Sequence, residues 1–165
     1  MSVLRIGDIK EQCFDTATLS AFARQQSSVP LRRAGAMTEL VIAGVAACLA
    51  GEADRSTMVL WGSRMGARAA GIRVVVDVAI ARESPFPFDF LATQPILAAI
   101  PLQKSFPCIE SALYQPWTGD AALHWQRMRM LAAVFLQAGR HARVLCGQVE
   151  PGEGEHIGRW QMLEN

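Results

Sequence analysis

A short turn near the middle of the chain has the geometry that α/β enzymes use to expose a nucleophile. It reads QPWTGD (residues 115–120), and it joins an expected strand, residues 107–114, to an expected apolar helix, residues 121–138. A strand, a sharp turn and a buried helix lift a nucleophilic side chain to the mouth of a pocket. This turn holds no cysteine and no serine. The sequence therefore predicts a catalytic scaffold that lacks its catalyst.

The other groups that can act as nucleophile or base are poorly placed in the sequence. Thr118 is the only hydroxyl in the turn, and without an identifiable base it is a poor nucleophile. None of the three histidines, His124, His141 and His156, has a partner at a recognisable spacing. We expect His124 to lie within the helix after the turn, and we expect all three to have structural roles.

The cysteines do not form a metal or disulfide pattern. Cys13, Cys48, Cys108 and Cys146 are scattered in apolar settings, with no Cys-x-x-Cys pair and no histidine at zinc-finger spacing. We interpret them as reduced core thiols, and we expect no metal and no cofactor. The segment GSRMG (residues 62–66) is a candidate phosphate site, because a glycine turn between a strand and a helix can bind anions. Its spacing fits neither G-x-G-x-x-G nor a P-loop, so we favour a tight turn.

Length and composition restrict the class of protein. The 165 residues fit a single domain, residues 1–165, with a core at about residues 31–151. The formal net charge of +1 provides no global field for nucleic acid or an anionic membrane. No run reaches the roughly 18 apolar residues that a membrane helix needs, and Asp8 and Lys10 interrupt any signal peptide. We expect a cytoplasmic protein.

The order of elements is that of an α/β fold with a mixed sheet. A helix beginning near Leu31 precedes a buried strand, residues 57–61. Residues 72–80 suit either a strand or a helix, and we choose helix because their apolar positions form one helical stripe. Thr93 is expected to cap a short helix that ends at Pro101.

The second part of the chain supplies the turn, its helix and a last strand. Residues 121–138 are apolar on most of their circumference, so we expect a central buried helix with Trp125 and Phe135 in the core. Gly139 closes it. Residues 143–149 form an apolar strand, and a polar tail begins at Pro151. Four arginines of this region are interpreted as a solvated face that, with Arg32 and Arg33, can dock an acidic partner: Arg127, Arg129, Arg140 and Arg143.

This order of motifs resembles the N-terminal half of the β-ketoacyl synthases, which have the thiolase-like fold. The resemblance is to the short, chain-length-factor-like members of aryl-polyene and polyketide clusters. It covers roughly residues 31–151: the first long helix, the strand leading into GSRMG, Ser84-Pro85 with Phe88, the turn at residues 118–120 with its helix, and the strand beginning RVLC at residue 143. No single motif is diagnostic, so the resemblance rests on their order and spacing.

The resemblance implies a degenerate active site. Where a synthase has its acyl-accepting cysteine, near Trp117, Thr118 and Gly119, this chain has none. The half of the fold that would bring the two catalytic histidines is not expected here. Condensation needs a thiolate to hold the acyl chain and histidines to assist decarboxylation. The resemblance therefore implies a pseudoenzyme, not a condensing enzyme.

The resemblance also implies association, because half of this fold exposes apolar surface that monomers rarely tolerate. The strand at residues 107–114 is the implied contact, with Ile109, Ser111 and Leu113 on one face. The partner is a second copy or a full-length ketoacyl synthase, with an acyl carrier protein as a further partner. We expect a non-catalytic partner in fatty-acid or polyketide-type, aryl-polyene-like biosynthesis. Two alternatives stay open: an acyltransferase or hydrolase acting on acyl thioesters, and an orphan interaction domain.

Overall fold

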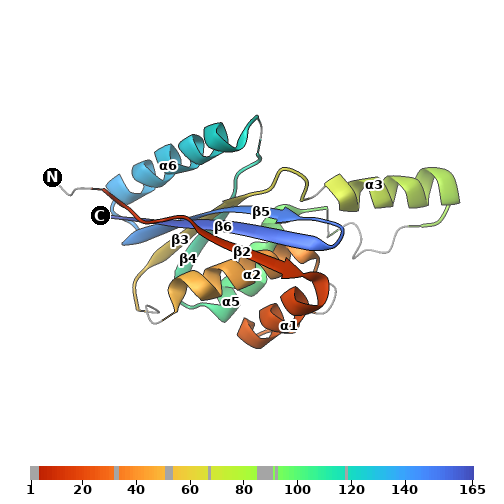
Figure 1. Cartoon of the computed structure of the whole chain (residues 1–165), viewed down its shortest axis with the longest axis horizontal. Coiled ribbons are helices and arrows are strands. Elements are labelled where there is room, and N and C mark those ends of the chain that lie inside the picture. The colour runs from red at the N-terminus through yellow and green to blue at the C-terminus, as the bar shows by residue number, and fades with distance from the viewer. Residues whose placement is uncertain are drawn as a thin grey trace.

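The protein is built around one mixed sheet of six strands (Figure 1). The computed structural model describes residues 4–31, 34–50, 54–66, 68–84, 91, 93–117 and 119–165. The strands are β1 (Arg5–Ile6), β2 (Lys10–Asp15), β3 (Thr57–Gly62), β4 (Ile109–Tyr114), β5 (Arg143–Pro151) and β6 (Glu155–Glu164). Their order is β1-β6-β5-β3-β4, with β2 also pairing with β6. The pairs β3–β4 and β3–β5 are parallel, and the pairs that include β6 are antiparallel.

Helices cover both faces of the sheet (Figure 1). On one face lie α1 (Thr16–Gln26), α2 (Ala36–Leu49) and α5 (Ala99–Ser105), with the 3-10 turn η2 (Pro95–Ala98) before α5. On the other face lies α6 (Ala121–Gln137). All six residues of β3 are buried, because helices pack on both of its faces. The predicted α/β fold with a mixed sheet is confirmed.

Trp160 packs between the sheet and α2. Its indole is fully buried on β6 and is paired across the ladder with Gly147 of β5. An added Cβ on Gly147 would lie 2.2 Å from the indole, and one on Gly44 of α2 would lie 1.9 Å from it. Two glycines therefore make the space in which the ring joins α2 to the sheet.

Helix α6 buries one side and exposes the other. His124, Trp125, Met128, Ala132 and Leu136 are buried against the sheet. Trp125 therefore belongs to the core, as predicted, while Phe135 is only half-buried at its margin. Met130 and Val134, on the outer side, are 63% and 61% exposed. The more completely enclosed helix is α2, which has nine buried residues.

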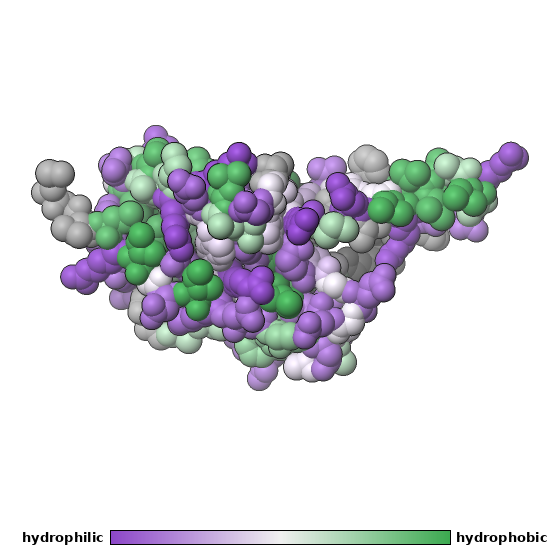
Figure 2. Space-filling model, turned by 45° about the horizontal axis from the view of Figure 1, so that its top comes forward, coloured by the Kyte–Doolittle hydropathy of each residue, from purple (hydrophilic) through white to green (hydrophobic). Residues whose placement is uncertain are grey.

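The helix predicted at residues 72–80 is confirmed, and it projects from the body as an arm (Figure 1). It comprises α3 (Arg68–Val76) followed by the π-helical turn η1 (Asp77–Ala81). Apart from η1, α3 makes no substantial contact with another described element. Figure 2 shows hydrophobic side chains along this arm. The exposed apolar residues, from 40% to 75% accessible, are Ile72, Val75, Val76, Val78 and Ile80.

Several predicted boundaries were wrong. The polar tail expected after Pro151 is instead β6, a ten-residue strand inside the sheet whose alternate residues are buried. Pro101 does not end its helix but sits in the first turn of α5. Proline is tolerated there because the first N–H groups of a helix have no intrahelical partner. The residue before η2 is Gln94, not Thr93.

Three predicted side-chain environments were also wrong. Arg143 is not on a solvated face: it is fully buried, and its Nε donates to Thr57 Oγ1 at 2.7 Å. Cys13 is exposed, because β2 lies at the margin of the sheet, and its thiol donates to Glu155 at 2.9 Å. Ile109 does not share a face with Ser111 and Leu113. A register shift between Thr57 and Met58 leaves Glu110 unpaired, so Ile109 turns into the α2 side of the core.

None of the helices in the described ranges has the length and apolar character needed to cross a membrane. Residues 85–90 of the predicted Ser-Pro loop lie outside the described residues. Arg32 and Arg33 lie outside them too.

Candidate functional site

The turn between β4 and α6 has the elbow geometry that the sequence predicts. After β4 ends, the Gln115 N–H donates to the Trp61 carbonyl at 2.7 Å, which keeps the chain beside β3. Gly119 has φ +83°, a left-handed conformation that glycine adopts without strain. Asp120 is the N-cap of α6 and accepts from the Leu123 N–H at 2.7 Å. The chain therefore reverses from strand to helix within six residues.

Buried polar groups lie directly beneath the elbow. The rings of Trp117 and His124 stack with centroids 5.0 Å apart. Gln148 of β5 donates to the Ala121 carbonyl at 3.0 Å and lies 3.1 Å from His124 Nδ1. Burial lowers the pKa of His124 below its ordinary 6.5, and the Gln115 carbonyl partly offsets this effect. His124 is therefore a neutral, structural part of the elbow.

Gly62 provides the space for this arrangement. An added Cβ at Gly62 would lie 2.5 Å from both the Gln115 carbonyl and the His124 ring. The close approach explains one glycine of the GSRMG segment. Gly66 is similar, because the Ser63 hydroxyl accepts its N–H at 2.7 Å and leaves no room for a side chain. The predicted tight turn is confirmed at both glycines.

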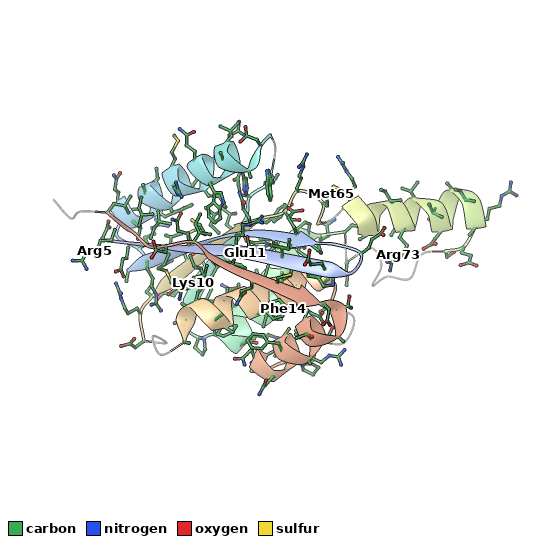
Figure 3. All side chains as sticks on the ribbon, viewed as in Figure 1. Arg5, Lys10, Glu11, Phe14, Met65 and Arg73 are labelled. Atoms are coloured by element: carbon green, nitrogen blue, oxygen red, sulfur yellow. The ribbon has the colours of Figure 1, made fainter. Side chains whose placement is uncertain are left out.

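An open cavity of about 1020 Å³ lies above the elbow. Its floor is the start of α6, and its far wall is the segment that leads from β3 into α3, where Met65 lies close to the start of α3 (Figure 3). The residues that line it come from the segment after β3, from α3, from the elbow, and from α6, β5 and β6. They are Arg64, Met65, Arg68, Trp117, Gly119, Asp120, Ala121, Glu150 and Arg159.

Comparison with known proteins identifies the fold. No protein-family model matches the sequence, and no curated protein matches it. A solved structure does: the ketosynthase ApeO in complex with its chain length factor ApeC, from Xenorhabdus doucetiae. The TM-score is 0.62 at 15% identity, over the whole of this chain and 80% of the matched chain. The fold is the thiolase-like ketosynthase fold. A weaker match, the ishigamide ketosynthase/chain length factor, has a TM-score of 0.44 at 16% identity, over 68% of this chain and 36% of that one.

Within the ketosynthase fold, the predicted elbow residues lie at the cavity. Trp117 and Gly119 line it, and Thr118 lies outside the described residues. The Trp117 ring is held against His124, so it occupies the turn with an aromatic side chain. Sequence reasoning missed the cavity arginines Arg68 and Arg159, and it considered the segment that contains Arg64 as an anion site but favoured a tight turn. The sequence did not indicate Arg159 as a site residue, because Arg159 lies in β6, which the sequence predicted to be a polar tail.

The residues expected at the association edge lie on β4, which pairs only with β3 among the described strands. Leu113 is 37% exposed, Ser111 is half-buried, and Ile109 is buried in the core. Edge strands expose unpaired backbone groups that another chain can pair with. Leu113 is thus the best-placed of the three residues to contact a partner.

A second polar cluster lies at the opposite end of the parallel strands. The Ser111 hydroxyl is 3.0 Å from His141 Nε2, and His141 Nδ1 is 3.5 Å from a Glu110 carboxylate oxygen. The Ser56 hydroxyl is 3.4 Å from the same Nδ1. Residues 110 and 141 are too far apart in sequence for spacing to reveal this cluster. It has the order of groups found in serine hydrolases, a nucleophile, a base and an orienting carboxylate.

Three of the four cysteines are poorly suited to nucleophilic chemistry. Burial raises the pKa of the Cys146 thiol to about 12, so the thiol stays protonated at neutral pH. Burial also raises the pKa of Cys48, and the hydrogen bond to Glu155 raises the pKa of Cys13. Within the described ranges, no group of three or more His, Cys, Asp or Glu side chains is arranged to hold a metal ion.

Proposed function

We propose that this chain is a non-catalytic, ketosynthase-like partner protein that binds a complete ketosynthase, or a second copy of itself, in fatty-acid or polyketide-type biosynthesis of the aryl-polyene kind. The observation that carries the proposal is the elbow. It keeps the strand, turn and capped helix of the ketosynthase fold, but the turn is built from Trp117, Thr118 and Gly119 instead of a cysteine. The chain has the fold of a ketosynthase, but its turn has no cysteine that could supply the acyl-accepting thiolate.

Two surfaces support association as the function of this fold. The β4 edge offers unpaired backbone groups together with the exposed Leu113. The arm formed by α3 and η1 exposes five large apolar side chains and makes no substantial contact with the other described elements. Isolated helices of this length are marginal in water, especially when rich in β-branched residues. A partner that covers the arm would stabilise both the helix and the complex.

The resemblance to a ketosynthase bound to its chain length factor suggests the type of partner. In that solved pair, a ketosynthase associates with its chain length factor. For this chain we propose the same logic, with carrier-bound acyl chains handled by the partner and shaped by the complex. A cytoplasmic location follows from that role.

Co-expression with the complete ketosynthase from the same genome tests the partner. The two chains should co-purify, and light scattering should give the mass of a defined heteromer with an interface of roughly 1,200 Å² or more. A chain that stays monomeric at micromolar concentration, both alone and with the synthase, would contradict the proposal. Intact-mass spectrometry after incubation with acyl and malonyl thioesters tests the lack of catalysis. We expect no covalent adduct on this chain, whereas an adduct mapped to Thr118 or a cysteine would favour an acyltransferase.

A hydrolase is a second candidate, and one observation favours it: the cluster of Ser111, His141 and Glu110. Its location argues against it, because Ser111 lies within an edge strand, at the opposite end of the parallel strands from the elbow. Hydrolysis of p-nitrophenyl acetate that is abolished by Ser111→Ala and retained by Ser56→Ala would establish the hydrolase. Equal rates for both variants and the wild type would exclude this cluster as its active site.

A further inference from the structure

Two helix N-termini converge on the cavity above the elbow. Arg68 begins α3 and Ala121 begins α6, and both line the cavity. The N-terminus of a helix carries unpaired N–H groups and a partial positive charge, which together favour anions. Asp120 already accepts the Leu123 N–H, and the Arg68 N–H donates to the Met65 carbonyl at 2.8 Å, so a ligand would bind other amides of the two first turns.

Three guanidinium groups from separate segments surround the same cavity. Arg64 follows β3, Arg68 begins α3, and Arg159 belongs to β6. Neither Arg64 nor Arg68 has a side-chain hydrogen bond or ion pair with any residue that the structure describes. Arg159 donates to Glu11 at 2.5 Å. Arg64 and Arg68 can therefore bind a ligand without losing a side-chain hydrogen bond within the described residues, although Arg64 also attracts the Glu150 carboxylate.

The two carboxylates at the cavity are already occupied. Asp120 caps α6, and Glu150 accepts the Arg64 backbone N–H at 2.6 Å. Burial raises the pKa of Glu150, and the nearby guanidinium groups of Arg64 and Arg159 partly offset this effect. Three arginines face two carboxylates at the cavity, so the balance of charged groups is cationic.

The cavity also has an apolar wall. Met65 and Trp117 line it beside the arginines. The indole N–H of Trp117 is buried and has no hydrogen-bond partner among the described residues, so it is the face of the ring, not this donor, that we assign to the cavity wall. A ligand with an anionic head and an apolar body would satisfy all of these groups.

We propose that this cavity binds a phosphate-type oxyanion, with Arg64 and Arg68 holding the anion and Trp117 and Met65 contacting the organic group attached to it. A doubly charged oxyanion suits two or more arginines, because guanidinium groups bind phosphate oxygens in pairs of hydrogen bonds. The site goes beyond the partner role, because association through β4 or the arm requires neither arginine. Binding of an anion at this site also does not require an acyl-accepting cysteine in the turn.

Binding is measured by calorimetry and by quenching of tryptophan fluorescence on the purified chain. The probes are inorganic phosphate, phenyl phosphate and acetate. We expect phosphate to bind, phenyl phosphate to bind more tightly because its ring contacts Trp117 and Met65, and acetate to bind more weakly than either. Affinity should fall as salt rises, since exposed charges are screened. Equal affinity for phosphate and phenyl phosphate would overturn the assignment of the apolar wall.

Matched arginine variants decide whether the cavity is the site. Arg64→Gln with Arg68→Gln should weaken phosphate binding about tenfold or more, as expected for lost charge-assisted hydrogen bonds. Arg24→Gln, on α1 and far from the cavity, should bind like the wild type. Glu11→Gln should tighten binding, because it releases Arg159. The four substituted side chains are exposed, so we expect each variant to fold. Circular dichroism would check this.

The proposal is overturned if phosphate gives no signal at millimolar concentration, or if the double arginine variant and Arg24→Gln bind it equally. Loss of phosphate binding in folded variants that still form the heteromer would separate this site from the partner function. Failure of the partner experiment alone would leave the anion site standing, because it is measured on the isolated chain.

Discussion

The indole ring of Trp117 lies parallel to the imidazole of His124, with an interplanar angle of 6° and 5.0 Å between centroids. Stacking places His124 in a site from which water is excluded, so its pKa is lowered from 6.5. The unfolded chain therefore binds a proton at His124 more readily than the folded chain. Linkage then requires that the stability contributed by neutral His124 is fully present above about pH 6.5 and is lost as pH falls toward the lower folded pKa.

We therefore predict that the urea midpoint falls between pH 7.5 and pH 5.5. The His124→Gln variant should show a smaller fall over this range, because its side chain does not titrate there. If His124→Gln and the wild type lose the same stability on acidification, His124 is not the group responsible.

Gly119 is predicted to be essential to the elbow for a conformational reason. An alanine at φ +83° adopts a left-handed conformation that costs an L residue about 1–2 kcal/mol. Its Cβ would also lie 3.3 Å from Leu123. Gly119→Ala should lower the free energy of unfolding by about that amount. Gly154→Ala is the control: the added Cβ meets nothing within 4 Å and φ is not left-handed, so its effect should stay within about 0.5 kcal/mol. Equal midpoints for the two variants would show that position 119 does not need the left-handed conformation that favours glycine.

The sequence predicted the elements around the elbow because their signals are local. The buried strand β3, the cap and helix of α6, and Gly139 with φ +68° all follow from patterns within a few residues. Even the ambiguous segment at residues 72–80 was decided correctly by its helical stripe, although the structure turns that stripe outward.

The features that sequence missed depend on contacts between distant segments. β6 appears polar at its start, and its burial arises only from pairing with β5 on one side and β1 and β2 on the other. Ile109 changes face because of a register shift in the ladder, which no alternation pattern reveals. The cavity arginines come from β6, from the segment before α3 and from the start of α3, so their approach depends on the fold of the whole sheet.

Leu113 on the edge strand β4 should control self-association or binding to a synthase. Leu113→Lys places a charge on the exposed edge, where it opposes strand pairing and burial of the side chain. We predict dissociation of the assembly, measured as a fall in mass by light scattering. Ile9→Lys is a suitable control, because Ile9 is 45% exposed near the opposite edge of the sheet. An unchanged mass for Leu113→Lys would mean that β4 is not the contact.

The packing of Trp160 on Gly147 gives a test of the core that does not depend on function. A methyl group at position 147 would lie 2.2 Å from the Trp160 ring, which is enclosed between β5 and α2 and has no room to move. Gly147→Ala should therefore cost about 1–3 kcal/mol, the range for overpacking a core. In a Trp160→Leu background the clash is relieved, so the same substitution should cost much less. The difference between the two backgrounds, measured by chemical denaturation, is the coupling energy of the pair. If Gly147→Ala destabilises both backgrounds equally, its cost comes from the backbone of β5, and the glycine does not serve to accommodate the ring.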